Sequence, residues 1–123
     1  MNKEELENVM AGCYGTKGYY KNPMFNVNYT DGVKCFCQNA GGGAYWLLTD
    51  ICLFVREARK KNPNEDMFSI HLVVNNGKAD LLFKDGDDEV CYKRHYSLTD
   101  CPDGDWCFYY FVSDRVLIWN GEY

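Results

Sequence analysis

The stretch from Gly43 to Lys61, GAYWLLTDICLFVREARKK, decides the fold of this 123-residue chain. Its large apolar side chains recur at steps of three and four residues, which places them on one stripe of an α-helix because 3.6 residues make a turn. Asn62-Pro63 ends the helix, since the residue before a proline avoids the helical region. The predicted stripe comprises Ala44, Leu47, Leu48, Ile51, Phe54, Val55 and Ala58. Such a helix covers one face of a sheet.

Beyond Pro63 the apolar period changes from that of a helix to that of a strand. Apolar residues alternate with polar ones over 68–74, 79–83 and 90–96, which is typical of strands with one buried face. Asn76-Gly77 favours a tight hairpin turn between the first two. Two aromatic strands, 106–112 and 115–119, close the chain. These segments predict an antiparallel meander of about five strands.

Two shorter helices are predicted before the long one. Asn2 followed by Glu5 is typical of a capping box. Thr30-Asp31 predicts a second helix start, with the hydroxyl or carboxylate accepting hydrogen bonds from the first free amides. The segment between these helices is predicted to be a loop that leads into a short extended piece. The whole chain, residues 1–123, is therefore expected to form one α+β domain, with two to three N-terminal helices packed on one face of the antiparallel sheet.

Charge and cysteine content limit the partners and the location. The net charge of −5 opposes long-range attraction to nucleic acid, so no direct nucleic-acid binding is expected, and it favours a basic partner. The start MNKEELENVM lacks the apolar core of a signal peptide, and no apolar run is long enough to span a membrane. An odd number of cysteines, seven, cannot all pair within the chain. We therefore expect reduced thiols, a cytoplasmic location and no membrane partner.

The glycine run Gly41-Gly42-Gly43 has two interpretations. It can form a tight corner between two helices, because glycine adopts left-handed backbone conformations readily. It can also form a phosphate-binding loop at the N-terminus of the long helix. We favour the corner, since the lysine–hydroxyl pair of a P-loop and the dinucleotide-binding fingerprint are both missing from the sequence.

The cysteines and histidines allow a metal site or a reactive thiol. Cys35-x-Cys37 has too short a gap for a zinc knuckle, so Cys91, His95 and Cys107 are the remaining metal alternative. We favour structural thiols and surface histidines, and we predict no cofactor. A catalytic Cys–His pair stays open, because such residues meet in space and not in sequence.

The run of acidic residues at Asp85, Asp87 and Asp88 is either a solvated turn or a functional surface. Asp and Gly are common in turns, which favours the first interpretation. In the second, the carboxylates imitate nucleic-acid phosphates and occupy a basic groove on a partner protein.

The aromatic residues are too numerous for one core, since ten tyrosines and three tryptophans are present. Some rings are therefore expected at a contact between two copies of the chain, as in a homodimer, or in a nucleotide pocket with Lys34, Lys93 and Arg94 supplying positive charge. With the acidic residues, the candidate binding residues are Tyr19, Tyr20, Lys34, Tyr45, Trp46, Asp85, Asp87, Asp88, Tyr92 and Arg94.

Several short motifs fall in order along the chain. They are Gly15-Thr16 with Tyr19-Tyr20 and Pro23, Tyr29 to Lys34, Ala44 to Leu48 with Asp50-Ile51, Thr99-Asp100 before Pro102, and Val116 to Trp119 with Glu122-Tyr123. Together they resemble a family of small uncharacterised proteins carried by phages, plasmids and bacterial genomes. The resemblance implies an α+β fold and a mobile-element setting, and it supplies no catalytic residues. The chain departs from the pattern at Gly41 to Gly43, at Trp119 and at Gly121.

By context, small acidic proteins of mobile elements are similar to phage counter-defence proteins, which include inhibitors of CRISPR nucleases and sponges for nucleotide signals. We therefore expect a non-catalytic binding protein in the cytoplasm of a bacterial host. It would inhibit a host defence protein, such as a CRISPR nuclease, by protein–protein occlusion. One alternative is a sponge that holds an anionic nucleotide in a tyrosine-lined pocket. Another is a metal-stabilised or cysteine-dependent enzyme.

Overall fold

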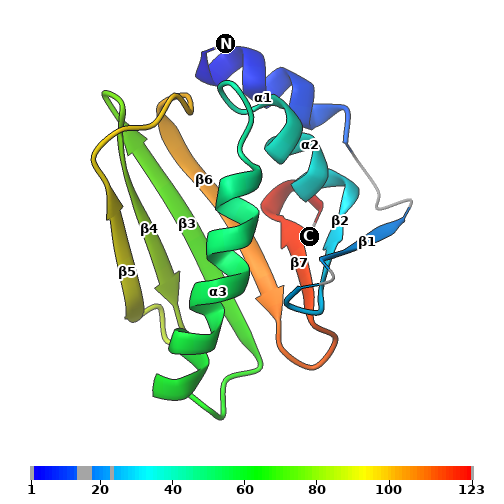
Figure 1. Ribbon diagram of the computed structural model, residues 1–123, viewed down its shortest axis with the longest axis vertical. Coiled ribbons are helices and arrows are strands. Elements are labelled where there is room, and N and C mark those ends of the chain that lie inside the picture. The colour runs from blue at the N-terminus through cyan, green and yellow to red at the C-terminus, as the bar shows by residue number, and fades with distance from the viewer. Residues whose placement is uncertain (1, 14–17, 23, 123) are drawn as a thin grey trace.

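A computed structural model describes residues 2–13, 18–22 and 24–122 of the chain (Figure 1). The helices within these residues are α1 (Lys3–Ala11), α2 (Asp31–Asn39), α3 (Tyr45–Lys61) and the 3-10 turn η1 (Asn120–Glu122). The strands are β1 (Tyr19–Asn22), β2 (Val27–Thr30), β3 (Met67–Asn75), β4 (Lys78–Lys84), β5 (Val90–Tyr96), β6 (Gly104–Phe111) and β7 (Val116–Trp119). The predicted α+β class with N-terminal helices is confirmed. The motif residues Gly15, Thr16, Pro23 and Tyr123 lie outside the described residues.

The strands of the described region form one sheet in the order β1-β2-β7-β6-β3-β4-β5. The five predicted strands are present as β3 to β7, and Asn75 pairs with Lys78 across the predicted hairpin turn. The sheet differs from a simple meander, in which β6 would pair with β5. Here β6 pairs with β3, along the edge of β3 that does not contact β4. An unpaired edge of β3 would leave backbone donors and acceptors unsatisfied in the middle of the molecule.

The segment predicted as a loop that leads into a short extended piece contributes two strands, and β2 corresponds to the extended piece. β1 and β2 pair antiparallel, and β2 joins the sheet by a short parallel pairing with β7. This is the one parallel pair in the described sheet, which is otherwise antiparallel as predicted. The loop prediction was wrong for β1, because its exposed polar and aromatic residues carry no alternating apolar signal.

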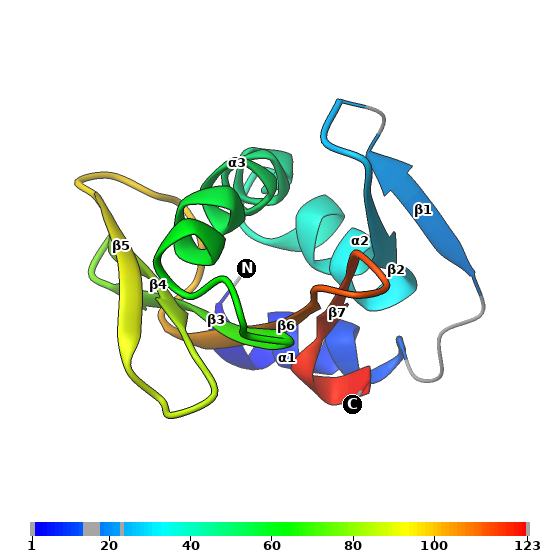
Figure 2. The ribbon, with the colours of Figure 1, turned by 90° about the horizontal axis from the view of Figure 1, so that it is seen from below.

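The sheet is curved, and α3 lies in its hollow with α2 beside it (Figure 2). The helix buries Leu47, Leu48, Ile51, Cys52, Val55 and Ala58, which confirms the predicted stripe apart from Phe54. Phe54 is only partly buried and lies at the margin of the core. On the sheet, Phe68, Ile70, Leu72, Leu81 and Phe83 are fully buried. The α1 helix lies across one end of the sheet, and Leu6 and Met10 are its buried residues.

The N-terminus of α2 is capped from the far end of the chain. Thr30 occupies the N-cap position, and its hydroxyl donates a hydrogen bond to the Glu122 carboxylate. The other oxygen of Glu122 accepts from the backbone N–H of Gly32 at 3.0 Å. A Cβ atom at position 32 would overlap this carboxylate, so a larger residue there would displace Glu122 from the cap. The predicted helix start is therefore correct, but the Thr30 hydroxyl donates where an acceptor was predicted.

Replacing Glu122→Gln tests this cap, because glutamine keeps the length of the side chain and removes its charge. Hydrogen bonds to a charged group stabilise more than neutral ones, so we expect the free energy of unfolding to fall by about 1–3 kcal/mol. Urea unfolding at neutral pH measures the change. Glu89→Gln, on an exposed turn, is the control and should change stability by less than about 0.5 kcal/mol. Equal stability of both variants would contradict the role of Glu122.

Candidate functional site

A cavity of about 500 Å³ opens between the start of α3 and the end of β5. We call it the Trp46 cavity, and its lining residues are Trp46, Tyr96, Leu98, Thr99 and Asp100. Leu98 is 85% exposed at this opening, whereas Tyr45, next to Trp46 in the chain, is 44% exposed and does not line the cavity. The volume lies within the range of about 300–1,000 Å³ that is usual for ligand pockets. The cavity is therefore large enough to admit a side chain or a small ligand.

The two rings of the Trp46 cavity are held in a fixed arrangement. Trp46 meets Tyr96 edge to face, with ring centroids 5.0 Å apart. The Tyr96 hydroxyl donates a hydrogen bond to Asp50, one turn further along α3. Burial, together with the carboxylate of Asp50, raises the pKa of Tyr96 above its ordinary value. The hydroxyl therefore stays protonated at neutral pH and keeps the ring attached to α3.

The predicted binding residues Arg94 and Tyr92 join α3 to β5 and do not line the cavity. The guanidinium of Arg94 lies 5.0 Å from the ring centroid of Phe54 and 3.9 Å from an oxygen of Asp50. Tyr92 stacks on Phe54 with centroids 5.1 Å apart. Much of the charge of Arg94 is therefore balanced by Asp50. Tyr92 and Arg94 hold β5 against α3 next to the cavity.

The glycine corner contacts one lining residue of the cavity, Asp100. The backbone N–H of Gly42 donates to the carboxylate of Asp100 at 2.7 Å. Gly41 has a φ of +56°, and a Cβ atom there would overlap Asp100. This supports the corner interpretation, because the Gly42 N–H that could bind a phosphate already donates its hydrogen bond to the Asp100 carboxylate. The motifs that contain Trp46 and Asp100 thus meet at one place in the fold.

The remaining aromatic candidates form a separate group on β1 and α2. Tyr20 stacks on Tyr29 with centroids 5.6 Å apart, and the Lys34 ammonium lies 4.1 Å from the Tyr20 ring centroid. Tyr19 is 65% exposed on the same strand. None of Tyr19, Tyr20 and Lys34 lines the Trp46 cavity. The predicted tyrosine-lined pocket is therefore not assembled from these residues and Trp46.

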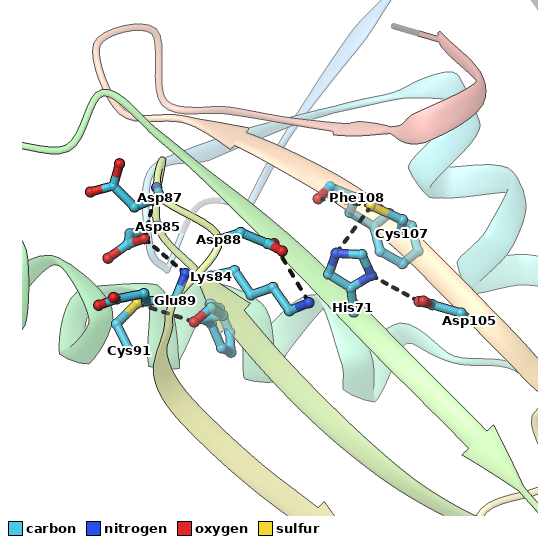
Figure 3. Close-up of polar contacts among 11 residues, drawn as sticks. His71, Lys84, Asp85, Asp87, Asp88, Glu89, Cys91, Asp105, Cys107 and Phe108 are labelled. Carbon is cyan, nitrogen blue, oxygen red and sulfur yellow. Dashed lines mark hydrogen bonds and ion pairs between the residues drawn. The ribbon is translucent and has the colours of Figure 1, made fainter.

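The acidic run lies in the turn between β4 and β5 (Figure 3). The carboxylate of Asp85 accepts from the backbone N–H groups of Asp87 and Glu89 at 2.9 and 3.0 Å, and Asp88 pairs with Lys84 at 3.6 Å. Asp85 therefore shapes the turn, as the solvated-turn interpretation requires. This turn precedes β5 and the Trp46 cavity follows it, so the two features lie at opposite ends of the strand.

The structure does not assemble the alternative metal site. Cys91 and His95 lie on β5, whereas Cys107 lies on β6, with β3 and β4 between them. The Cys91 thiol donates to the Phe83 carbonyl, and His95 contacts Asp80 at 2.9 Å. In the described part of the chain, no group of three or more His, Cys, Asp or Glu residues is arranged to hold a metal ion.

A polar row on the face of the sheet opposite α3 was not predicted from the sequence. Nδ1 of His71 lies 2.9 Å from Asp105, and Nε2 lies 3.8 Å from the Cys107 thiol (Figure 3). Burial raises the pKa of Cys107, so the thiol is protonated at neutral pH. The signal in the sequence is that Asp105 and Cys107 are two positions apart, so both point to the same face of a strand. The pairing of β6 with β3 then brings His71 opposite Cys107 on that face.

The architecture and the cavity define a small α+β domain with an aromatic hollow beside its central helix. The chain belongs to a family of unknown function, DUF6876, whose model matches residues 4–123. Comparison with curated proteins gave no match, and comparison with solved structures gave none either. Across the described residues, no helix has the length and apolar character needed to cross a membrane.

The Tyr96 hydrogen bond predicts a pH-dependent stability effect. Because the folded-state pKa of Tyr96 is raised, its contribution is fully present at neutral pH and is lost as the pH rises above the ordinary tyrosine value near 10. Tyr96→Phe should therefore lower the free energy of unfolding by about 1 kcal/mol at pH 7 and reduce the loss of stability at alkaline pH. Urea unfolding at several pH values measures both effects. Tyr19→Phe is the control, and an identical alkaline profile in the two variants would contradict the assignment.

Proposed function

We propose that this chain is a non-catalytic binding protein that holds an apolar side chain of a partner protein in the Trp46 cavity. The exposure of Leu98 beside the paired rings of Trp46 and Tyr96 supports this proposal. Tryptophan and tyrosine are enriched among the residues that dominate binding energy at protein interfaces. The rings are held by α3 and β5, so little conformational entropy is lost when a partner binds.

Charge favours a basic partner segment. Asp100 lines the Trp46 cavity, and the whole chain carries a net charge of −5. Complementary charge accelerates association and selects partners. The occupant is therefore proposed to be an apolar side chain flanked by lysine or arginine. Asp85, Asp87 and Asp88 lie in the turn before β5 and do not line the Trp46 cavity.

The finer proposal is that the partner is a host defence protein, such as a CRISPR nuclease, which the chain inhibits by occlusion in the bacterial cytoplasm. The support is the resemblance of its motifs to proteins carried by phages and plasmids, together with small size and acidity. The geometry of the Trp46 cavity supports recognition of a protein and does not select among defence proteins.

Leu98→Glu tests the cavity, because Leu98 is largely exposed and its replacement should leave the fold intact. We expect the variant to lose inhibition of a sensitive defence nuclease and to bind it at least about 10-fold more weakly, a cost of 1.4 kcal/mol or more. Met24→Glu is the matched control, since Met24 is 77% exposed and lies outside the Trp46 cavity. Cleavage assays and binding isotherms across a panel of purified defence nucleases provide the measurement.

Two outcomes would contradict the proposal. Equal effects of the Leu98 and Met24 variants would show that the cavity has no special role. A dimer of the free protein that Leu98→Glu dissociates would assign the cavity to a second copy of the chain.

A cysteine-dependent activity is the second candidate function, and the spacing of Cys107, His71 and Asp105 is the observation that favours it. In this proposal Nε2 of His71 accepts the thiol proton as the sulfur attacks a carbonyl carbon, whose π electron pair moves to the carbonyl oxygen, and Asp105 holds the Nδ1 proton. Cys107 also lines a second cavity, of about 340 Å³, between β6 and α1.

Alkylation by iodoacetamide, followed by mass spectrometry, tests this candidate. Cys107 and Cys91 are each 8% exposed, which makes Cys91 an internal control. We expect Cys107 to react about 10-fold faster or more, and His71→Gln to remove the difference. Equal rates at the two thiols in the folded wild-type protein would dismiss the candidate.

A further inference from the structure

Three arginines from two distant segments surround a small hollow on the other side of α3. Arg56 and Arg59 lie in the second half of α3, and Arg115 lies in the turn between β6 and β7. Together with Phe25 and Tyr110 they line a cavity of about 190 Å³, which we call the arginine pocket. No residue of the Trp46 cavity takes part in it.

The arginines of the pocket have no ion-pair partner among the residues that the structure describes. Although the sequence contains 18 acidic residues, none of Arg56, Arg59 and Arg115 forms an ion pair within the described part of the chain. Like charges around one hollow repel one another, and an anion placed between them reverses the sign of that energy. This local surplus of positive charge stands out in a chain whose overall charge is negative.

A ring contact and an electrostatic effect link the arginines to two other residues that line the pocket, Phe25 and Tyr110. The guanidinium of Arg56 lies 5.0 Å from the ring centroid of Phe25. Burial raises the pKa of Tyr110, while the charges of Arg59 and Arg115 oppose that rise. The two guanidinium groups therefore act on one buried phenol from different segments.

The backbone at Arg115 argues against a merely solvated arginine. Its φ of +53° lies in the left-handed region, where the backbone of most residues other than glycine is strained. The Arg115 carbonyl accepts from the N–H of Asn28 at 2.7 Å, which ties this turn to β2. The helix dipole accounts for positive charge near the end of α3 and gives no reason for arginine on the turn.

A second hollow shares two lining residues with the arginine pocket. Its volume is about 360 Å³, and it is lined by Arg56, Arg59, Lys60 and Pro63. Because the two hollows share Arg56 and Arg59, one ligand can place an anionic group in the smaller hollow and its remainder in the larger one.

We propose that the arginine pocket binds a phosphate-bearing small molecule of nucleotide size, with the phosphate among the guanidinium groups of Arg56, Arg59 and Arg115. Arginine suits this ligand because its planar fork of donors matches phosphate oxygens. The site is independent of the Trp46 cavity. It also moves the nucleotide-sponge alternative from Tyr19, Tyr20 and Lys34 to a different surface.

Titration calorimetry of the purified protein at low ionic strength tests the proposal with inorganic pyrophosphate, adenosine 5′-monophosphate and uncharged adenosine. We expect saturable binding of the two phosphate compounds, and adenosine should bind at least about 10-fold more weakly. Arg59→Gln and Arg115→Gly should each weaken pyrophosphate binding by about 10-fold or more. Arg115→Gly relieves the strained φ, so thermal unfolding should show a fold at least as stable as the wild type.

The controls separate a specific pocket from general attraction between charges. Lys93→Gln makes the same change in net charge as Arg59→Gln but lies on β5 outside the pocket, and it should bind pyrophosphate like the wild type. Leu98→Glu should also bind pyrophosphate normally if the two sites are independent. Absence of saturable binding, or equal weakening by Lys93→Gln and Arg59→Gln, would overturn the proposal.

Discussion

The packing of α3 in the hollow of the curved sheet is the contact on which both candidate surfaces depend (Figure 2). Each fully buried aliphatic or aromatic side chain in that contact stabilises the fold by about 1.5–3 kcal/mol. Ile51, Ile70 and Phe83 are examples with no more than 1% exposure. Once the stripe is buried, the flanks of α3 are fixed in direction. One flank presents Trp46 towards β5, and the other presents Arg56 and Arg59 towards the β6–β7 turn.

Local patterns in the sequence were sufficient to predict most elements of the fold. The helical period over α3 and the alternation over β3, β4 and β5 are properties of neighbouring residues, so they can be read without knowing the tertiary structure. The return of β6 to β3, the parallel pairing of β2 with β7 and the cap supplied by Glu122 are contacts between distant segments. No local period encodes such pairings, which is why they appear only in the three-dimensional structure.

The candidate sites were predictable only in part, for the same reason. Trp46 was identified because it opens an amphipathic helix beside three glycines, and the structure places it at a cavity. Tyr92 and Arg94 looked equally available in the sequence, yet their pairing partners Phe54 and Asp50 lie on another element. Arg59 could be explained by the helix dipole alone, so its convergence with Arg115 was not visible in the sequence.

The length of α3 sets how many ligands the domain can hold at once. Trp46 and Arg59 are thirteen positions apart on this helix, which corresponds to an axial separation of about 20 Å. A side chain seated at one end would not collide with a phosphate compound seated at the other. The two proposed sites are therefore compatible with a ternary complex of one-to-one-to-one stoichiometry. Because a single rigid rod connects the two ends, any cooperativity between them would require that rod to shift on the sheet.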